Sequence, residues 1–286
     1  MKEPNRPIAW ANFLRNAWGN HFPVDVKMIA MDYSQRYDDP IKKIQPAELD
    51  SFEGALFPLR KSGKWAILYN PNIRESGRIN FTIAHELGHY LSHRQMRPSG
   101  FECGEAKVLG IDEASSDRAI ENEADAFASY LLMPLDDYRN QVGGNEMSLD
   151  LLNHMADRYD VSRTAAAIKW LDFTPRRAML VVATNGFVLW CWRSKAAKRS
   201  RLFFERGMQL PSGSLAANRA LAENASDLGV QLAPNIWPVQ SDVREMAILA
   251  DNYEMTISLL VFDDAPPNNF GFEEDVDDDV YDRFSR

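Results

Sequence analysis

The segment FTIAHELGHY, residues 81–90, places His85 and His89 four positions apart, with Glu86 directly after the first histidine. On an α-helix, residues four apart differ by about 40° in direction and about 6 Å in rise, so both imidazoles point to the same side. Two such nitrogens can bind one Zn²⁺, and the Glu86 carboxylate can reach a water on the metal without displacing a ligand. The segment therefore predicts a helix that carries a metal site.

A third ligand has to come from elsewhere in the chain, and the acidic segment ENEADAFA, residues 121–128, is the candidate. If this segment is helical, Glu121 and Asp125 share one face, whereas Glu123 points about 200° away from Glu121. Glu121 is therefore favoured as the ligand, with Glu123 as the alternative. Asp125 is then placed to accept the outer N–H of a ligand histidine, most simply His85.

The remaining histidines are weaker candidates. His93 lies eight residues beyond His85, about 12 Å along a continuous helix, so one ion cannot easily bind both. We interpret His93 as a residue at the end of the helix near the site, and His21 and His154 as ordinary surface or core histidines. Gly88 lacks a side chain beside the site, which would let a neighbouring element pack closely.

Hydrophobic periodicity and turn residues predict the other elements. We expect helices at 7–20, 24–33, 76–93 and 116–133, a helix pair within 148–172, hairpins at 54–70 and 178–192, and strands at 202–204 and 256–262. The dipeptide Asn185-Gly186 suits a type I′ turn. Pro58 indicates an edge position, and Trp65–Tyr69 is interpreted as an edge strand that could pair with an extended peptide. Residues 97–115 are interpreted as a loop.

The character of the sequence changes after Pro175, which predicts an α+β protein of two domains and a tail. Residues 1–175 are expected to form the metal-binding domain, closed by the helix pair, and residues 176–262 a smaller mixed α/β domain. Residues 263–286 carry nine acidic and two basic residues and few core formers. Such a composition predicts a disordered tail.

Composition limits the classes of function. The formal net charge is −9, which argues against a general affinity for nucleic acid, because phosphate contacts need clustered Lys and Arg. Two cysteines, Cys103 and Cys191, cannot build a disulfide framework and favour a reducing cytoplasm. The sequence has no signal-peptide core and no apolar run of about 18 residues, so no membrane segment is expected.

Two separated motifs together resemble the ImmA/IrrE family of metallopeptidases. They are RINFTIAHELGHYLSH, residues 78–93, and ENEADAFASYLLMP, residues 121–134, and the resemblance covers about residues 10–172. It implies a gluzincin-like fold, mainly helical with a small sheet, and a third ligand at Glu121, in agreement with the geometric choice. Some family members carry a C-terminal GAF-like sensory domain, for which residues 176–262 are the candidate.

The same resemblance implies zinc-dependent limited proteolysis of a specific protein. The usual target is a helix-turn-helix repressor, whose cleavage switches on phage, mobile-element or stress-response genes. In the expected mechanism His85, His89 and Glu121 hold Zn²⁺, and Glu86 acts as the general base. These ligands also accept Mn²⁺ and other first-row divalent ions. The sequence does not indicate an oligomeric state.

Two other functions stay open at this point. The helix pair at 148–171 resembles a helix-turn-helix, but its second helix offers only Arg163 and Lys169 as cations for DNA. A protein that captures a repressor without cutting it needs no general base, so Glu86 disfavours this alternative. The basic run 193–206 is interpreted as a solvated loop. Alternatively, this run could bind an acidic partner or nucleic acid, or be covered by the chain's own acidic tail.

Overall fold

The computed structural model describes residues 3–49, 52–103, 115–250 and 254–263. Contacts group these residues into two compact units, the first made of 3–141 with 156–162 and the second of 142–155 with 163–263. The helix pair that is expected to close the first domain is divided between the units. Two domains with separate functions remain a prediction. The segments 104–114 and 264–286, with nearly all of the expected tail, lie outside the described residues.

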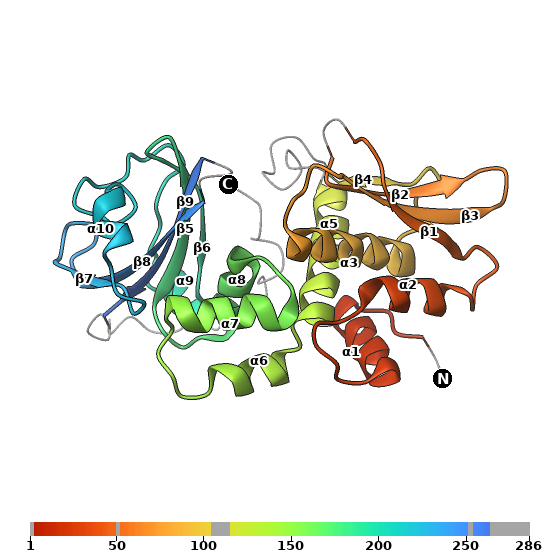
Figure 1. Cartoon of the computed structure of the whole chain (residues 1–286), viewed down its shortest axis with the longest axis horizontal. Helices are drawn as coiled ribbons and strands as arrows, with labels where there is room; N and C mark the ends of the chain where they lie inside the picture. The colour runs from red at the N-terminus through yellow and green to blue at the C-terminus, as the bar shows by residue number, and fades with distance from the viewer. Residues whose placement is uncertain (1–2, 50–51, 104–114, 251–253, 264–286) are drawn as a thin grey trace. The chain divides into compact units, whose positions relative to one another are not determined.

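The sequence predicted four of the helices in the N-terminal half, namely α1 (Pro7–Trp18), α2 (Val26–Ser34), α3 (Ser76–Ser92) and α5 (Ser115–Leu132) (Figure 1). It did not predict α6 (Leu135–Val142). Pro7 occupies the first turn of α1, where its missing N–H costs nothing, and the Asp25 side chain accepts the N–H of Met28 at the start of α2. Helix α5 ends before Pro134, which disfavours helical backbone in the residue preceding it.

The first unit contains a four-stranded sheet. Its strands are β1 (Ile41–Pro46), β2 (Gly54–Leu59), β3 (Lys64–Tyr69) and β4 (Phe101–Cys103), in the order β1-β3-β2-β4. The β2–β3 hairpin is confirmed as antiparallel, while β1 runs parallel to β3. Helix α3 contacts β2 and β3 of this sheet and also α5, which places it in the middle of the unit.

Two sequence interpretations in this region are wrong. Strand β3 pairs on both sides, so Trp65–Tyr69 is not an edge strand and offers no free backbone to an extended peptide. The expected loop at 97–115 contains β4, which pairs with β2 over Gly54–Leu56. Pro58 lies beyond the last β2–β4 pair, where its missing N–H breaks no bond of that ladder.

The second unit is built on a five-stranded antiparallel sheet of order β6-β5-β9-β8-β7. The strands are β5 (Ala178–Thr184), β6 (Phe187–Arg193), β7 (Val230–Leu232), β8 (Val243–Ala250) and β9 (Met255–Phe262). This unit also contains α8 (Arg163–Phe173), α9 (Lys195–Arg199), α10 (Arg219–Glu223) and the part of α7 (Leu149–Tyr159) that precedes residue 156. The described chain is thus mixed α+β with two small sheets, and none of its helices is long and apolar enough to cross a membrane.

In this unit the predicted hairpin is confirmed, whereas two other sequence predictions are wrong. Asn185 and Gly186 have φ values of 50° and 80°, the positive pair that a type I′ turn requires, and the hairpin is confirmed. The strand expected at 202–204 is wrong. Its apolar residues serve packing instead, because the Phe204 ring stacks on buried Trp237 with centroids 5.2 Å apart. The basic run 193–206, expected to be a loop, contains the short helix α9.

A buried carboxylate organises the second core. Glu245 on β8 is fully buried, and it accepts the backbone N–H groups of Leu215 at 2.9 Å and Ala216 at 3.0 Å. It also accepts the indole N–H of Trp237 at 3.1 Å and the hydroxyl of Ser258 at 2.6 Å. Four donors from separate segments compensate a charge that would be costly to bury alone. Glu245 therefore fastens the long connection between β6 and β8 to the sheet.

Replacing Glu245 by Gln is expected to lower the free energy of unfolding by about 3 kcal/mol, because an amide places its own donor against donors and removes the charged acceptor. Urea denaturation followed by tryptophan fluorescence measures the change. Glu223→Gln is the matched control, since its side chain is 54% exposed and bonds Arg219 within one helix. That control should move stability by less than about 0.5 kcal/mol. Equal losses in both variants would contradict this role of Glu245.

Candidate metal centre

Three side chains from α3 and α5 converge in the first unit. His85 and His89 lie on one face of α3, and their Nε2 atoms are 3.0 Å apart. The Oε2 atom of Glu121 on α5 lies 3.1 Å from Nε2 of His85 and 3.5 Å from Nε2 of His89. The structure therefore brings together the two histidines and the glutamate that the sequence selects.

The spacing of these atoms fits a divalent metal ion. Bonds of about 2.0–2.1 Å to a tetrahedral Zn²⁺ separate neighbouring ligand atoms by about 3.3 Å, close to the three distances observed. The chemistry of the donor set agrees. Burial lowers the pKa of His89 to about 3 despite the opposing effect of Glu121, so the ring is neutral. Burial raises the pKa of Glu121, but hydrogen bonds with both histidines outweigh it and hold that pKa well below its usual value.

Asp125 contacts the outer nitrogen of the first histidine. Its Oδ1 lies 2.8 Å from Nδ1 of His85, on the side of the ring opposite to the cluster. An ionised carboxylate there can only accept, so the His85 proton belongs on Nδ1 and the Nε2 lone pair faces Glu121 and His89. As the four-residue spacing predicts, Glu121 and Asp125 lie on the same face of α5, and both contact His85.

The base candidate, Glu86, is fully buried beside the histidines on α3. The start of β2 approaches it closely at Gly54. A Cβ atom added to Gly54 would lie 2.9 Å from Oε1 of Glu86, closer than real Cβ contacts come. The absence of a side chain at Gly54 therefore leaves room for the carboxylate between the helix and the sheet.

Close packing of the two helices depends on Gly88. A Cβ atom at this position would lie 3.0 Å from Cδ1 of Phe127 and 3.2 Å from Cα of Ala124, both on α5. These distances are tighter than most real Cβ contacts, and one of the two atoms belongs to the backbone. The predicted role of Gly88 in close packing is confirmed, because a larger residue would push Glu121 away from the histidines.

Sequence reasoning missed Phe101 and the contacts that His93 and Glu123 make near His89. The Phe101 ring on β4 stacks on the His89 ring, with centroids 4.3 Å apart and planes 11° from parallel. His93, expected at the end of the helix, is the C-cap of α3, and its Nδ1 lies 3.1 Å from Nδ1 of His89. Glu123, the alternative ligand, contacts His93 rather than the cluster. The one signal for Phe101 was an isolated aromatic residue in a polar segment.

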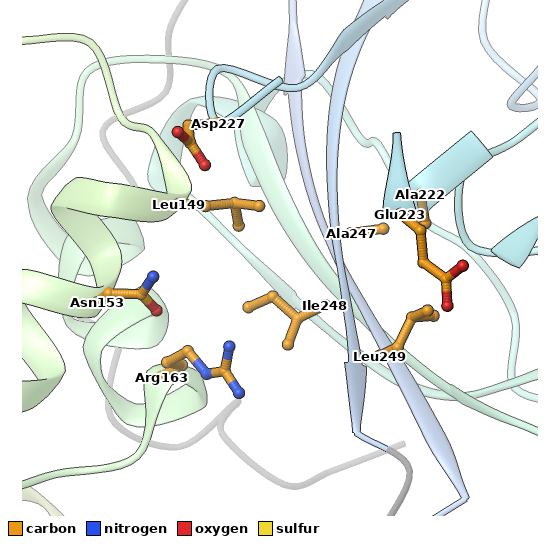
Figure 2. Close-up of a pocket in the computed structure, with 9 residues that line it drawn as sticks. All are labelled: Leu149, Asn153, Arg163, Ala222, Glu223, Asp227, Ala247, Ile248 and Leu249. Carbon is orange, nitrogen blue, oxygen red and sulfur yellow. The ribbon is translucent and has the colours of Figure 1, made fainter. Parts of the chain in front are cut away.

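The second unit contains a cavity of about 260 Å³, shown in Figure 2. Its lining comes from Leu149 and Asn153 of α7, Arg163 of α8, β8 and the α10 region, and it includes no histidine or cysteine. Burial raises the pKa of the Cys191 thiol to about 12, which disfavours the reactive thiolate. Among the described residues, the α3–α5 cluster is therefore the best candidate for a functional site. His21 and His154, which are both exposed, lie outside that cluster.

Comparison with known proteins agrees with this placement. Residues 40–171 match the model of the Peptidase_M78 family, described as the IrrE N-terminal-like domain, and this span contains the whole cluster. A solved structure of a Mycobacterium tuberculosis transcriptional regulator is similar, with a TM-score of 0.54 and 12% identity over 90% of this chain and 76% of that one. At this identity the likeness concerns the fold alone. No curated protein matches the chain.

Replacing Gly88 by Ala tests whether helix packing sets the cluster. Alanine favours the helix by up to about 1 kcal/mol, whereas overpacking costs about 1–3 kcal/mol, so the free energy of unfolding should change little. Zinc affinity, measured by competition with a chromophoric chelator, should fall by about tenfold or more because Glu121 moves. Gly144→Ala, with nothing within 4 Å of the added Cβ, is the control. Unchanged zinc affinity in Gly88→Ala would contradict this view of the cluster.

Proposed function

The chain belongs to the ImmA/IrrE family of metallopeptidases, and from this premise we propose that it is a zinc-dependent endopeptidase that cuts one specific protein. The observation that supports this most is the cluster itself. Two imidazole nitrogens and a carboxylate oxygen lie 3.0–3.5 Å from one another, with a fully buried glutamate on the same helix. These residues can supply the ligands and the base of metal-assisted peptide hydrolysis.

In the proposed mechanism, each side chain has one task. His85, His89 and Glu121 hold the metal ion, which supplies Lewis-acid activation of water and of the substrate carbonyl when bound. Glu86 accepts the proton of the attacking water and then gives it to the leaving amine. Burial of Glu86 keeps bulk water away from this proton transfer. Asp125 fixes the His85 tautomer that leaves Nε2 available.

The proposed substrate is a helix-turn-helix transcriptional repressor in the cytoplasm, whose cleavage would derepress phage, mobile-element or stress-response genes. Membership in the family supports this substrate class. Zinc is the proposed ion because a carboxylate and two imidazoles suit it, although manganese accepts the same ligands. We further propose that residues 1–175 act as the peptidase domain and that residues 176–262 regulate it, as a GAF-like sensory domain would.

Direct reading of DNA by the helix pair is less well supported. Of the two cations that α8 offers, Lys169 is only 1% exposed, so its ammonium group is not available to a phosphate backbone. Arg163 remains at the surface of the unit. Because sequence-independent affinity for DNA depends on several phosphate contacts, one exposed arginine on this helix is a poor basis for it.

Replacing Glu86 by Gln should leave zinc binding intact and reduce cleavage by at least about 100-fold, because the amide cannot take a proton from water. The assay incubates the full chain with helix-turn-helix repressors from its own genome, those of neighbouring genes first, and follows fragments by mass spectrometry. Chelator should abolish cleavage by the wild type, and added Zn²⁺ should restore it.

The same assay separates the alternatives. Equal cleavage by wild type and Glu86→Gln would refute the role of Glu86 as general base. Release of the repressor from its operator without fragments, in both proteins, would favour capture over proteolysis. Salt-sensitive binding of the chain itself to duplex DNA would favour the DNA-binding alternative.

A further inference from the structure

The outer nitrogen of His89 begins a series of side-chain contacts that ends at a carboxylate. Nδ1 of His89 lies 3.1 Å from Nδ1 of His93, and Nε2 of His93 lies 3.0 Å from Oε2 of Glu123. The outer nitrogen of His85 reaches a carboxylate without an intervening residue, because its Nδ1 lies 2.8 Å from Oδ1 of Asp125. Both histidines of the cluster therefore connect, away from the cluster, to a carboxylate on α5.

Donor and acceptor chemistry allows one proton arrangement along this series. If Nε2 of His89 is to bind a metal ion, the ring proton must sit on Nδ1, which then donates to Nδ1 of His93. His93 must accept there, so it is neutral and carries its own proton on Nε2. That proton is donated to Glu123, whose ionised carboxylate only accepts. The tautomers of both histidines follow from the terminal carboxylate.

We propose that His93 and Glu123 are positioning residues for His89, which fix its tautomer and ring orientation in the way Asp125 does for His85. The inference rests on the proposed function in one respect, namely that the cluster binds a metal ion. It extends that function, since neither residue is one of the three ligands and His93 was expected only to end the helix.

The surroundings hold His93 in place for this task. As the C-cap of α3, it donates its backbone N–H to the carbonyl of His89 at 2.8 Å, which sets it one turn beyond that residue. Its side chain is only 4% exposed, so water cannot easily replace His93 as the acceptor for His89. Phe101 covers one face of the His89 ring, which prevents the ring from turning toward another acceptor.

A single helix supplies both ends of this arrangement. Glu121 and Glu123 are two positions apart on α5, so they leave the helix in different directions. Glu121 reaches the Nε2 atoms of the histidine pair, and Glu123 reaches the end of α3. Helix α5 therefore binds α3 at three points along its length, through Asp125, Glu121 and Glu123. Any shift of one helix along the other would break all three contacts.

Substitutions of His93 separate positioning from simple packing. His93→Leu removes the acceptor, whereas the side-chain oxygen of His93→Asn can take the place of Nδ1. We expect the zinc dissociation constant of the full chain, measured by chelator competition, to rise about 10- to 100-fold in His93→Leu. His93→Asn should restore most of the affinity. His154→Asn, at an exposed histidine outside the cluster, is the matched control and should bind zinc like the wild type.

A second readout follows the ring protons directly. Long-range ¹H–¹⁵N spectra of the zinc-loaded full chain should show the proton of His89 on Nδ1 and that of His93 on Nε2. Glu123→Gln should keep this pattern, because the amide oxygen still accepts, and should weaken zinc binding less than His93→Leu does. A proton on Nδ1 of His93 would overturn the inference.

The outcomes also separate this inference from the proposed function. If the wild type binds zinc and His93→Leu binds it equally well, His93 serves packing alone and only this inference fails. If the wild type binds no zinc, the metal site fails together with the positioning role. If zinc binding depends on His93 but no repressor is cut, the inference stands and the proposed proteolysis does not.

Discussion

Close packing of α3 against α5 at Gly88 is the constraint on which the cluster of His85, His89 and Glu121 depends. The two histidines of α3 supply two of the candidate ligands. The third, Glu121, comes from α5. With Cα of Ala124 only 3.2 Å from where a Gly88 Cβ would lie, the helices approach closely enough for Glu121 to meet both imidazoles. Asp125 and Glu123 then contact outer nitrogens from the same helix. The site is a property of the helix pair rather than of the motif on α3 alone.

Much of the candidate site was predictable because the spacing of nearby residues on a helix determines which side chains share a face. Helical spacing alone placed His85 and His89 together and put Glu121 and Asp125 on a common face, and the structure has both arrangements. The hairpins followed equally from local chemistry, since Asn185-Gly186 adopts the positive φ pair of its turn.

The failures share a dependence on distant partners. Whether Trp65–Tyr69 is an edge strand depends on β1, a strand of mixed polarity that the sequence did not reveal. The three-residue strand β4 depends on its pairing with β2. This pairing positions Phe101, a residue of β4, against the His89 ring. The apolar run at 202–204 packs in a loop near Trp237 instead of joining the sheet. His93 and Glu123 come together only through the packing of two helices.

X-ray absorption at the zinc edge of the metal-loaded full chain tests the central claim most directly. A metal ion held by two imidazoles and a carboxylate predicts a shell of nitrogen and oxygen atoms at about 2.0–2.1 Å, with the outer scattering of two imidazole rings. A sulfur neighbour at about 2.3 Å, or a shell without imidazole scattering, would contradict the proposed assembly of the site from α3 and α5.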